Sequence, residues 1–485
     1  MRRIPLLAGT KVVIASVPED AVVLRPPAPG AGIADVGAAV RDALRFPLEG
    51  EPLEALVRRR ARATIVVEPP VLPIPGSTAD PRQLAIGAVI DELERLGIPS
   101  GYQTILVACG LARRTTQREL ENLVTRDLAR RFHGHVVIHD AEDPDLVTID
   151  DGSRPALRVN RALVETDLVL VVSAAETVLN GGPGALLGAA GADAQRAAGA
   201  YSLLEASASQ GWHLGVALER ALSRRLPVVG VSLVLNHPRT SGALRGYPYE
   251  ADALERVAGS PLRRLFAALP DGARREILHG LQTELTAAAA FAGPPSVAHA
   301  EALLRAVELR RAEFDGPLDA IVIGIPGTTP YLPREAPNPL LAAYLGLGLA
   351  LRLWRDAFPV VDGGTAILAH RFSRSFAHPT QSPYRPFFHA ARIGRDPEIL
   401  AEAERAAAAN VRGIEDYRSG RSVHPLLPFR DWNACQPALG RLGAVLVAGA
   451  ADATAVRHLG FVPVHGLGAA LDLARGRTSG PARIG

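Results

Sequence analysis

Short β-branched runs alternate along the chain with longer stretches rich in Ala, Leu and Arg that have helical periodicity. Runs such as TILVAC and IVIGI are apolar at nearly every position, which is typical of parallel strands covered on both faces. Helical stretches are predicted over residues 82–96, 116–132, 215–225 and 397–413. Strands are predicted over residues 11–15, 64–67, 104–109, 136–139, 168–173, 228–233, 320–325, 365–369 and 444–448.

This alternation predicts an α/β protein with two Rossmann-like doubly wound domains and a cleft between them. The stretch AGPPS lies between an Ala-rich segment, predicted to be helical over residues 252–291, and a second series of alternating strands and helices. We therefore expect domains at residues 1–295 and 296–474, followed by a disordered tail at residues 475–485. The apolar stretch 340–354 is too short to span a membrane and predicts a buried core helix.

Composition narrows the possible chemistry of these 485 residues. The net charge of +3 is spread along the chain without basic and aromatic stripes, so no nucleic-acid partner is expected. Of 53 basic residues only Lys11 is a lysine, which excludes lysine chemistry away from the N-terminus. Cys109 and Cys435 form no CxxC motif, so a reducing cytoplasm is predicted and no bound metal is expected. Because the apolar stretch 340–354 is too short to span a membrane, no membrane partner is expected either.

A series of short motifs occurs in a characteristic order. The series comprises VRDALRFPLEGEPLEAL, TIVV, VLPIP at residues 71–75, IDELERLGI, TILVACG with LARR, the pair HD at 139–140, VNR at 159–161, TDLVLVVSA and NGGPGALLGAAG. In this order the chain resembles the lactate racemase family, whose cofactor is a nickel-pincer nucleotide. The resemblance implies hydride removal from the carbon that bears the substrate hydroxyl, with an arginine for the carboxylate, two histidines as acid and base, and a lysine that holds the cofactor.

The residues that would carry this mechanism differ in the present chain. Leu72 stands in the position of the family's arginine, Ala112 in that of one histidine, and Ala174 or Ala175 in that of the other. The cofactor's lysine position is Gly184. We therefore expect that the nickel-pincer machinery is lost and that no cofactor is bound. An alternative alignment would let Arg82, after Asp80, replace the missing arginine.

Other polar residues directly follow predicted strands, where open α/β sheets bind ligands. Arg113 and Arg114 are either an anion clamp or a surface pair, and Asn180, Gly181 and Gly182 are either an anion-binding loop or a turn. The same alternatives apply to Thr328 and Thr329 in GIPGTT. The richest group is His370, Arg371, Arg374 and His378, which could supply acid, base and carboxylate clamp, or be a polar interdomain loop.

The spacing of His133, His135 and His139 suggests a metal site, but no cluster of carboxylates or cysteines accompanies them. We predict that the cleft binds a small anionic ligand of the 2-hydroxy-acid type, with His370 and His378 as candidate catalytic residues. The alternatives are an active racemase or epimerase of 2-hydroxy acids and a non-catalytic metabolite-binding or regulatory protein. The sequence leaves the oligomeric state open.

Overall fold

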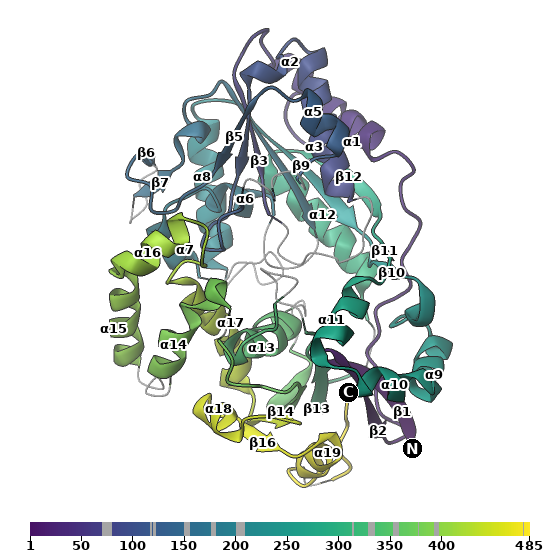
Figure 1. Cartoon of the computed structure of the whole chain (residues 1–485). Coiled ribbons are helices and arrows are strands. Elements are labelled where there is room, and N and C mark those ends of the chain that lie inside the picture. Colours follow the sequence, from purple (N-terminus) through teal and green to yellow (C-terminus); the bar gives the residue numbers. More distant parts are fainter. Residues whose placement is uncertain are drawn as a thin grey trace.

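The structure is a computed structural model that consists of two bodies stacked along one axis (Figure 1). It describes residues 1–69, 80–116, 119, 123–149, 156–175, 181–199, 209–312, 315–327, 335–352, 358–376, 378–391, 397–478 and 480–485. Each body is built around its own largely parallel sheet, which confirms the predicted α/β class.

The first body contains a six-stranded sheet in the order β12-β9-β8-β3-β4-β5. All pairs are parallel except β12, which pairs with β9 antiparallel at the edge. Every residue of β3 and β8 is buried, because helices cover both faces. The strands are β3 (Ala63–Val67), β4 (Gln103–Val107), β5 (His135–Ile138), β8 (Leu168–Ala175), β9 (Val228–Leu235) and β12 (Ala287–Gly293), and β6 (Val147–Ile149) and β7 (Leu157–Val159) form a separate hairpin.

Alternate residues of the strands contact two different helix layers. Ile65, Val67 and Ile105 pack with α1 and α3, whereas Val66 and Leu106 pack with α6, α7 and α8 on the other face. This alternation follows from the two-residue period of a strand. The helices of this body are α1 (Val36–Arg45), α2 (Leu53–Leu56), α3 (Pro81–Arg95), α5 (Arg126–Arg131), α6 (Pro183–Leu187), α7 (Ala192–Ala198), α8 (Gln210–Ser223) and α12 (Pro295–Arg310).

The second body contains a four-stranded parallel sheet in the order β13-β14-β15-β16. The stretch predicted to be a buried helix follows one helical path, from α13 through a π-helical segment, Tyr344–Leu349, to Arg352. The strands are β13 (Leu318–Gly324), β14 (Val360–Ala369), β15 (Ala444–Ala448) and β16 (Val462–Val464). The helices are α13 (Pro339–Ala343), α14 (Tyr384–Ala391), α15 (Pro397–Ala408), α16 (Val411–Arg418), α17 (Leu427–Arg441), α18 (Ala453–His458) and α19 (Leu467–Arg475).

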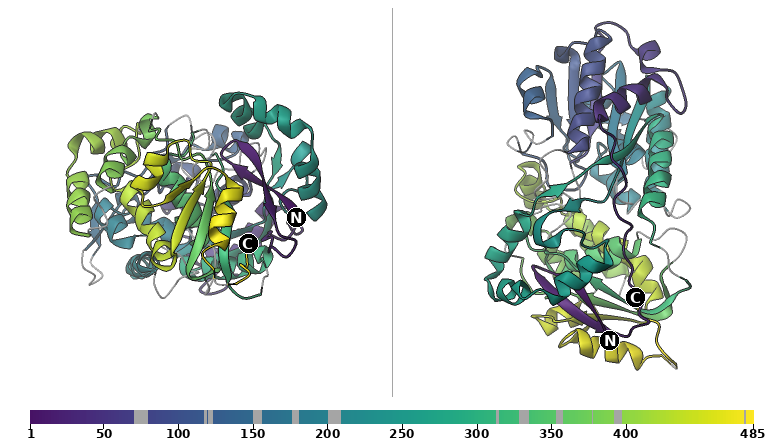
Figure 2. Two further views of the ribbon diagram at one scale, coloured as in Figure 1. Left: turned by 90° about the horizontal axis from the view of Figure 1, so that it is seen from below. Right: turned by 90° about the vertical axis from the view of Figure 1, so that its right-hand side faces the viewer.

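The N-terminal hairpin of β1 (Arg2–Ala8) and β2 (Lys11–Val17) packs on the second body (Figure 2). Ile4, Ala15 and Val17 share one apolar cluster with Ala320 and Ile367 of the second sheet. Three helices lie along the hairpin, namely α9 (Ala251–Gly259), α10 (Leu262–Ala268) and α11 (Asp271–His279). The first body thus lacks the start of the range predicted for it, and a short ribbon of β10 (Arg239–Thr240) and β11 (Thr283–Glu284) leads to and from these helices.

The other end of the predicted N-terminal domain also differs in the structure. The helix α12 packs on β8, β9 and β12, so the first body extends through Arg310 rather than ending at residue 295. Residues 287–293 form the edge strand β12 and not a helix, because their backbone pairs with β9 while α1 and α12 cover the two faces. Tertiary packing here outweighs the helix propensity of alanine.

The segment predicted to be a disordered tail instead lies along β13. The backbone NH of Arg483 donates to Asp319 Oδ2 at 2.7 Å, and the NH of Val322 donates to the carbonyl of Gly485 at 2.8 Å. Ile484 is buried in the same cluster as the N-terminal hairpin. In the part of the chain that the structure describes, none of the helices has both the length and the apolar character needed to span a membrane.

Candidate functional site at the strand ends

One group of contacts between the two bodies lies at the carboxyl ends of β4 and β5. We call this group the junction: Arg114, Asp140 and Glu142 of the first body with Tyr417, Arg418 and His424 of the second. Arg418 Nε donates to Asp140 Oδ2 at 2.9 Å, and His424 Nε2 lies 3.0 Å from Glu142 Oε1. The Tyr417 hydroxyl donates to the carbonyl of Gly110 at 2.8 Å and accepts from the NH of Ala141 at 3.2 Å.

Arg114, predicted as an anion ligand, belongs to this junction. Its Nε and Nη2 donate to the backbone carbonyls of His139 and Ile138, each at 3.1 Å, and its Nη1 donates to the carbonyl of Arg418. Its guanidinium also lies 3.7 Å from Asp140. The donors of Arg114 therefore hold strand ends together and are already engaged by protein acceptors.

Arg113, the preceding residue, points toward a different set of groups. Its guanidinium pairs with Glu119 and is largely buried, with 13% of the side chain exposed. In the described part of the chain its buried Nε has no hydrogen-bond partner. The positive charge of Arg113 also acts, as a minor effect, to lower the pKa of Glu335, a carboxyl group of the second body.

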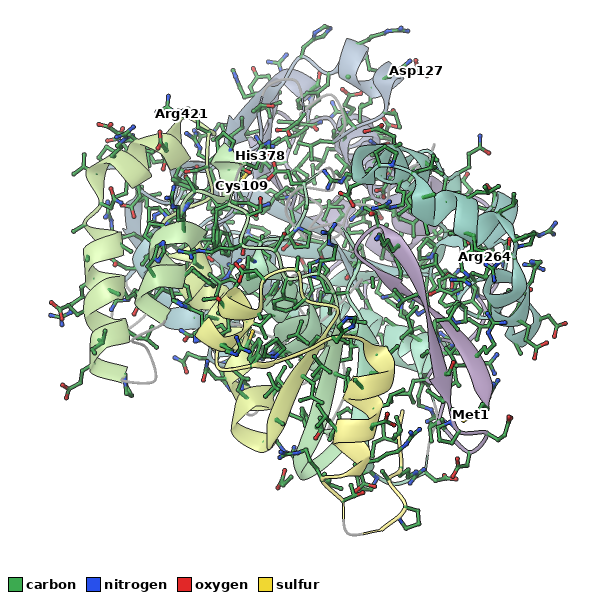
Figure 3. The ribbon with its side chains drawn as sticks, turned by 60° about the horizontal axis from the view of Figure 1, so that its bottom comes forward. Met1, Cys109, Asp127, Arg264, His378 and Arg421 are labelled. Atoms are coloured by element: carbon green, nitrogen blue, oxygen red, sulfur yellow. The ribbon has the colours of Figure 1, made fainter. Side chains whose placement is uncertain are left out.

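Glu335 orients the predicted candidate His378. His378 Nδ1 lies 2.8 Å from Glu335 Oε1, and the Thr380 hydroxyl donates to Glu335 Oε2 at 2.6 Å. Gln381 Nε2 donates to the same oxygen at 3.1 Å. Glu335 is 9% exposed and His378 51% exposed, so a buried carboxylate supports a ring that is open to solvent. We call Arg113, Glu335, His378 and Thr380 the cleft group; Figure 3 shows His378 in the central part of the molecule.

Burial and hydrogen bonds have opposite effects on the pKa of Glu335. Burial raises the pKa of Glu335 above its ordinary value, against the lowering effects of the Thr380 hydroxyl and of the charge of His378. His378 Nδ1 faces this carboxylate and the NH of Thr380, so Nε2 is the ring nitrogen left for a ligand. This is the arrangement in which a histidine can accept and return a proton.

The other predicted catalytic residue, His370, occupies a different environment. It is buried beside Gly9 in the turn of the N-terminal hairpin, and its Nδ1 accepts from the NH of Phe372 at 3.1 Å. Burial lowers the pKa of His370 to about 4, with a smaller lowering effect from Arg371. Because its neighbours are the hairpin turn and Phe372, His370 does not join the cleft group.

The two arginines between these histidines are also separated. The backbone carbonyl of Arg371 accepts from the NH of Ala451, at the end of β15. The guanidinium of Arg374 lies 6.0 Å from the ring centroid of Phe388, on an exposed part of the second body. Asn180, Thr328 and Thr329 lie outside the described residues.

The glycine loop before α6 packs tightly against a histidine that sequence reasoning missed. Gly181 and Gly182 have φ angles of +117° and +51°, and a Cβ on Gly181 would lie 2.0 Å from His299 Cε1. The NH of Gly182 donates to Ser173 Oγ at 3.0 Å, so a protein acceptor already engages it. His299 is buried, and its Nδ1 lies 2.8 Å from Ser232 Oγ. His299 was missed because it lies on the apolar face of a helix 117 positions after Gly182.

The remaining family positions can be located on the same strand ends. Ala112 follows β4, Ala174 and Ala175 end β8, and Gly184 is buried inside α6. Leu72 lies outside the described residues. Arg82 Nε donates to Asp80 Oδ1 at 2.9 Å and Oδ2 at 3.0 Å, so this guanidinium is engaged by a carboxylate of its own helix start.

The three histidines considered as metal ligands do not converge. His133 and His135 are exposed, whereas His139 is fully buried, with Nε2 2.9 Å from the carbonyl of Ala190. Burial lowers the pKa of His139 to about 4, which keeps its ring neutral. Among the described residues, no group of three or more His, Cys, Asp or Glu side chains is arranged to hold a metal ion.

Comparison with known proteins agrees with this architecture. Residues 9–182 match the family model described as the lactate racemase N-terminal domain. The lactate racemase apoprotein from Thermoanaerobacterium thermosaccharolyticum has the same fold, with a TM-score of 0.62 and 16% identity over 100% of this chain and 97% of that one. A protein from Thermotoga maritima aligns with a TM-score of 0.46 and 13% identity over 90% of this chain and 93% of that one. No curated protein matches the sequence.

Proposed function

We propose that this chain is a lactate racemase-like protein that binds a small anionic ligand of the 2-hydroxy-acid type in the predicted cleft between its two bodies, which the match of residues 9–182 to the family's N-terminal domain supports. The observation that carries the proposal is the Glu335–His378 pair of the second body, in which a buried carboxylate lies 2.8 Å from a half-exposed imidazole, while the charge of Arg113 helps to lower the pKa of that carboxyl group. These residues replace, in chemical terms, the clamp and the acid-base groups that the chain lacks at the family positions.

The chemistry of a 2-hydroxy acid suits these side chains. A guanidinium binds a carboxylate through charged hydrogen bonds, and the largely buried guanidinium of Arg113, whose Nη2 pairs with Glu119, would offer its Nε. An imidazole supported by a carboxylate can accept the proton of a neighbouring hydroxyl. Ligand binding would also place a negative charge beside Arg113, whose Nε has no partner in the described part of the chain.

The described residues do not fit the nickel-pincer nucleotide. The lysine position is Gly184 inside α6, and the histidine positions carry the methyl groups of Ala112 and Ala174 or Ala175. The space beside Gly181 is filled by the ring of His299. We therefore propose that the chain works without this cofactor, and no step of the proposed chemistry passes through it.

Proton transfer at the ligand is the second candidate function. A half-exposed histidine beside a buried carboxylate favours it, because such a pair can remove and return a proton at the hydroxyl-bearing carbon or its oxygen. A binding protein without catalysis would need only Arg113. Both cysteines are free and buried, which is compatible with the reducing cytoplasm expected for this chain.

The test combines binding and exchange measurements on the full chain. L-lactate, D-lactate, glycolate and L-malate are titrated by calorimetry, and exchange of the carbon-bound proton is followed by NMR in deuterated water. We expect Arg113→Gln to weaken binding about tenfold. His378→Gln should abolish exchange while leaving most of the binding.

Arg130→Gln is the matched control, since Arg130 is 80% exposed on α5, a helix of the first body that lies away from the second body in Figure 1, and it should change nothing. Absence of binding by all four acids would overturn the proposal. Nickel analysis and intact mass after co-expression with enzymes that make the pincer nucleotide provide a separate measurement. Stoichiometric nickel with a covalent adduct would refute the loss of the cofactor.

A further inference from the structure

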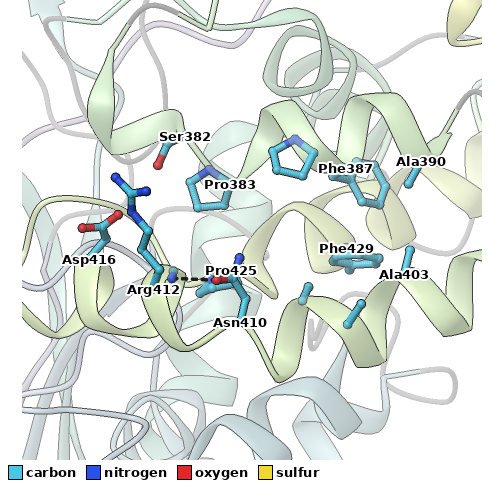
Figure 4. Close-up of a pocket in the computed structure, with 14 residues that line it drawn as sticks. Ser382, Pro383, Phe387, Ala390, Ala403, Asn410, Arg412, Asp416, Pro425 and Phe429 are labelled. Carbon is cyan, nitrogen blue, oxygen red and sulfur yellow. Dashed lines mark hydrogen bonds between the residues drawn. The ribbon is translucent and has the colours of Figure 1, made fainter.

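A pocket of about 420 Å³ lies in the second body, between α14, α15 and α16 and beside the start of α17 (Figure 4). This volume is within the range of small-molecule sites, which is about 300–1,000 Å³. It shares no residue with the cleft group or with the junction. Its walls are Ser382, Pro383, Pro386, Phe387, Ala390, Ala403, Ala406, Ala407, Asn410, Arg412, Gly413, Asp416, Pro425 and Phe429.

The two ends of this pocket differ in chemistry. At one end Phe387 and Phe429 lie with Ala390 and Ala403, and the two rings form a T-shaped pair with centroids 4.6 Å apart. Small alanine side chains on α14 and α15 leave the space that the rings border. This end can therefore accept an aromatic ring or a short alkyl chain.

The opposite end is polar and carries charged side chains. Arg412, Asp416 and Ser382 gather there, as Figure 4 shows. Asp416 is engaged by Arg421, whose Nε donates to Oδ1 at 2.9 Å. In the described part of the chain Arg412 has no carboxylate partner, so its guanidinium remains available for an anion.

We propose that this pocket binds a small amphipathic carboxylate, with its apolar part against Phe387 and Phe429 and its carboxylate on Arg412. An apolar wall at one end and a cation at the other favour a ligand that has both an apolar part and a carboxylate. A purely polar anion would make no contact with the rings of Phe387 and Phe429. An uncharged ligand would in turn leave Arg412 without a partner. The site is distinct from the proposed 2-hydroxy-acid site, since it is built from other residues.

The probe for this site is 3-phenylpropionate, titrated into the full chain by calorimetry. Its matched controls are 3-phenylpropanamide, which keeps the ring and removes the charge, and acetate, which keeps the charge and removes the ring. We expect both controls to bind at least about tenfold more weakly, the value of one charged hydrogen bond or of one buried ring.

Variants then locate the binding. Arg412→Gln should weaken 3-phenylpropionate about tenfold, and Ala403→Leu should abolish binding by filling the apolar end. Arg405→Gln is the matched control, because Arg405 lies on the neighbouring helix α15 but does not line the pocket. If Ala403→Leu lowers the melting temperature, Arg412→Gln still decides the question, since Arg412 is exposed.

The Arg113→Gln variant separates this site from the cleft group. Unchanged binding of 3-phenylpropionate in that variant supports a separate pocket, whereas its loss would place the probe in the cleft and overturn the proposal. Equal binding of acid and amide, or equal effects of Arg412→Gln and Arg405→Gln, would also overturn it. Failure of L-lactate to bind would refute the proposed function and leave this result untouched.

Discussion

The junction and the cleft group contain two neighbouring arginines, Arg114 and Arg113, whose surroundings differ. Arg114 is surrounded by carbonyls and by Asp140, so its donors stabilise the domain arrangement. Arg113 pairs with Glu119, and its buried Nε has no hydrogen-bond partner among the described residues. The difference teaches that two adjacent strand-end arginines can differ in how many of their donors the protein already engages, and the proposed function assigns the ligand to the arginine that keeps a donor unused.

The largest expected effect is that of acid on the buried His139, which directly precedes Asp140 of the junction. Burial lowers the pKa of His139 to about 4, below the ordinary value near 6.5, so the unfolded chain binds this proton more readily than the folded chain. The free energy of unfolding should therefore fall as pH drops from about 6.5 to about 4, by as much as ~3 kcal/mol from His139 alone. Urea unfolding at pH 7, 5.5 and 4.5 measures the change.

His139→Gln is the control for the acid effect, because its amide can still donate to the carbonyl of Ala190. The variant should lose the share of His139, while His237 and His370, whose pKa values are also lowered to about 4, keep theirs. An unchanged pH dependence in the variant would contradict the assignment.

Removal of the junction's carboxylate should have the next largest effect. Asp140→Ala leaves Arg418 and Arg114 without their shared acceptor, and we expect the free energy of unfolding to fall by about 2 kcal/mol. Asp127→Ala is the matched control, because its partner Arg130 and Asp127 itself are exposed, and it should cost less than about 0.5 kcal/mol. Equal losses in the two variants would mean that the junction does not hold the bodies together.

The smallest stability effects should distinguish the two arginines directly. Arg114→Gln should lower the free energy of unfolding by about 1–2 kcal/mol and leave lactate binding nearly unchanged, because its donors bind backbone carbonyls. Arg113→Gln should have less effect on stability and more on binding. Chemical unfolding and calorimetry on the same samples test this, and the reverse pattern would exchange the two roles.

Most of the fold could be predicted because its central strands are apolar at nearly every position. All nine predicted strands correspond to strands of the structure. The edge strand β12 was predicted to be helical because residues 287–290 are all alanine, which favours helix. The pairing with β9, which makes this segment a strand, is not indicated by the local sequence. The packing of the N-terminal hairpin on the second body could not be predicted either, because its partners Ala320 and Ile367 lie more than 300 residues away in the sequence.

The candidate site was only partly predictable for a related reason. Strand-end reasoning named Arg113 and His378 as candidates, but no local pattern distinguishes Arg113 from Arg114 or His378 from His370. Glu335 was not among the predicted site residues, because its contact with His378 depends on the tertiary fold and not on the local sequence. Pairing and burial, which decide these roles, come from contacts between segments distant in sequence.

The hairpin of β1 and β2 also has a consequence for the order of events during synthesis. A ribosome adds about 5–20 residues per second, so Ile4 and Val17 emerge roughly 15 s to more than a minute before Ala320, Ile367 and Leu446, with which they form one cluster. The first body can complete its sheet in that interval, whereas the second body cannot close before its final strand is made. We therefore expect the nascent chain to carry a finished first body and an exposed apolar hairpin, which is the state that a chaperone would meet.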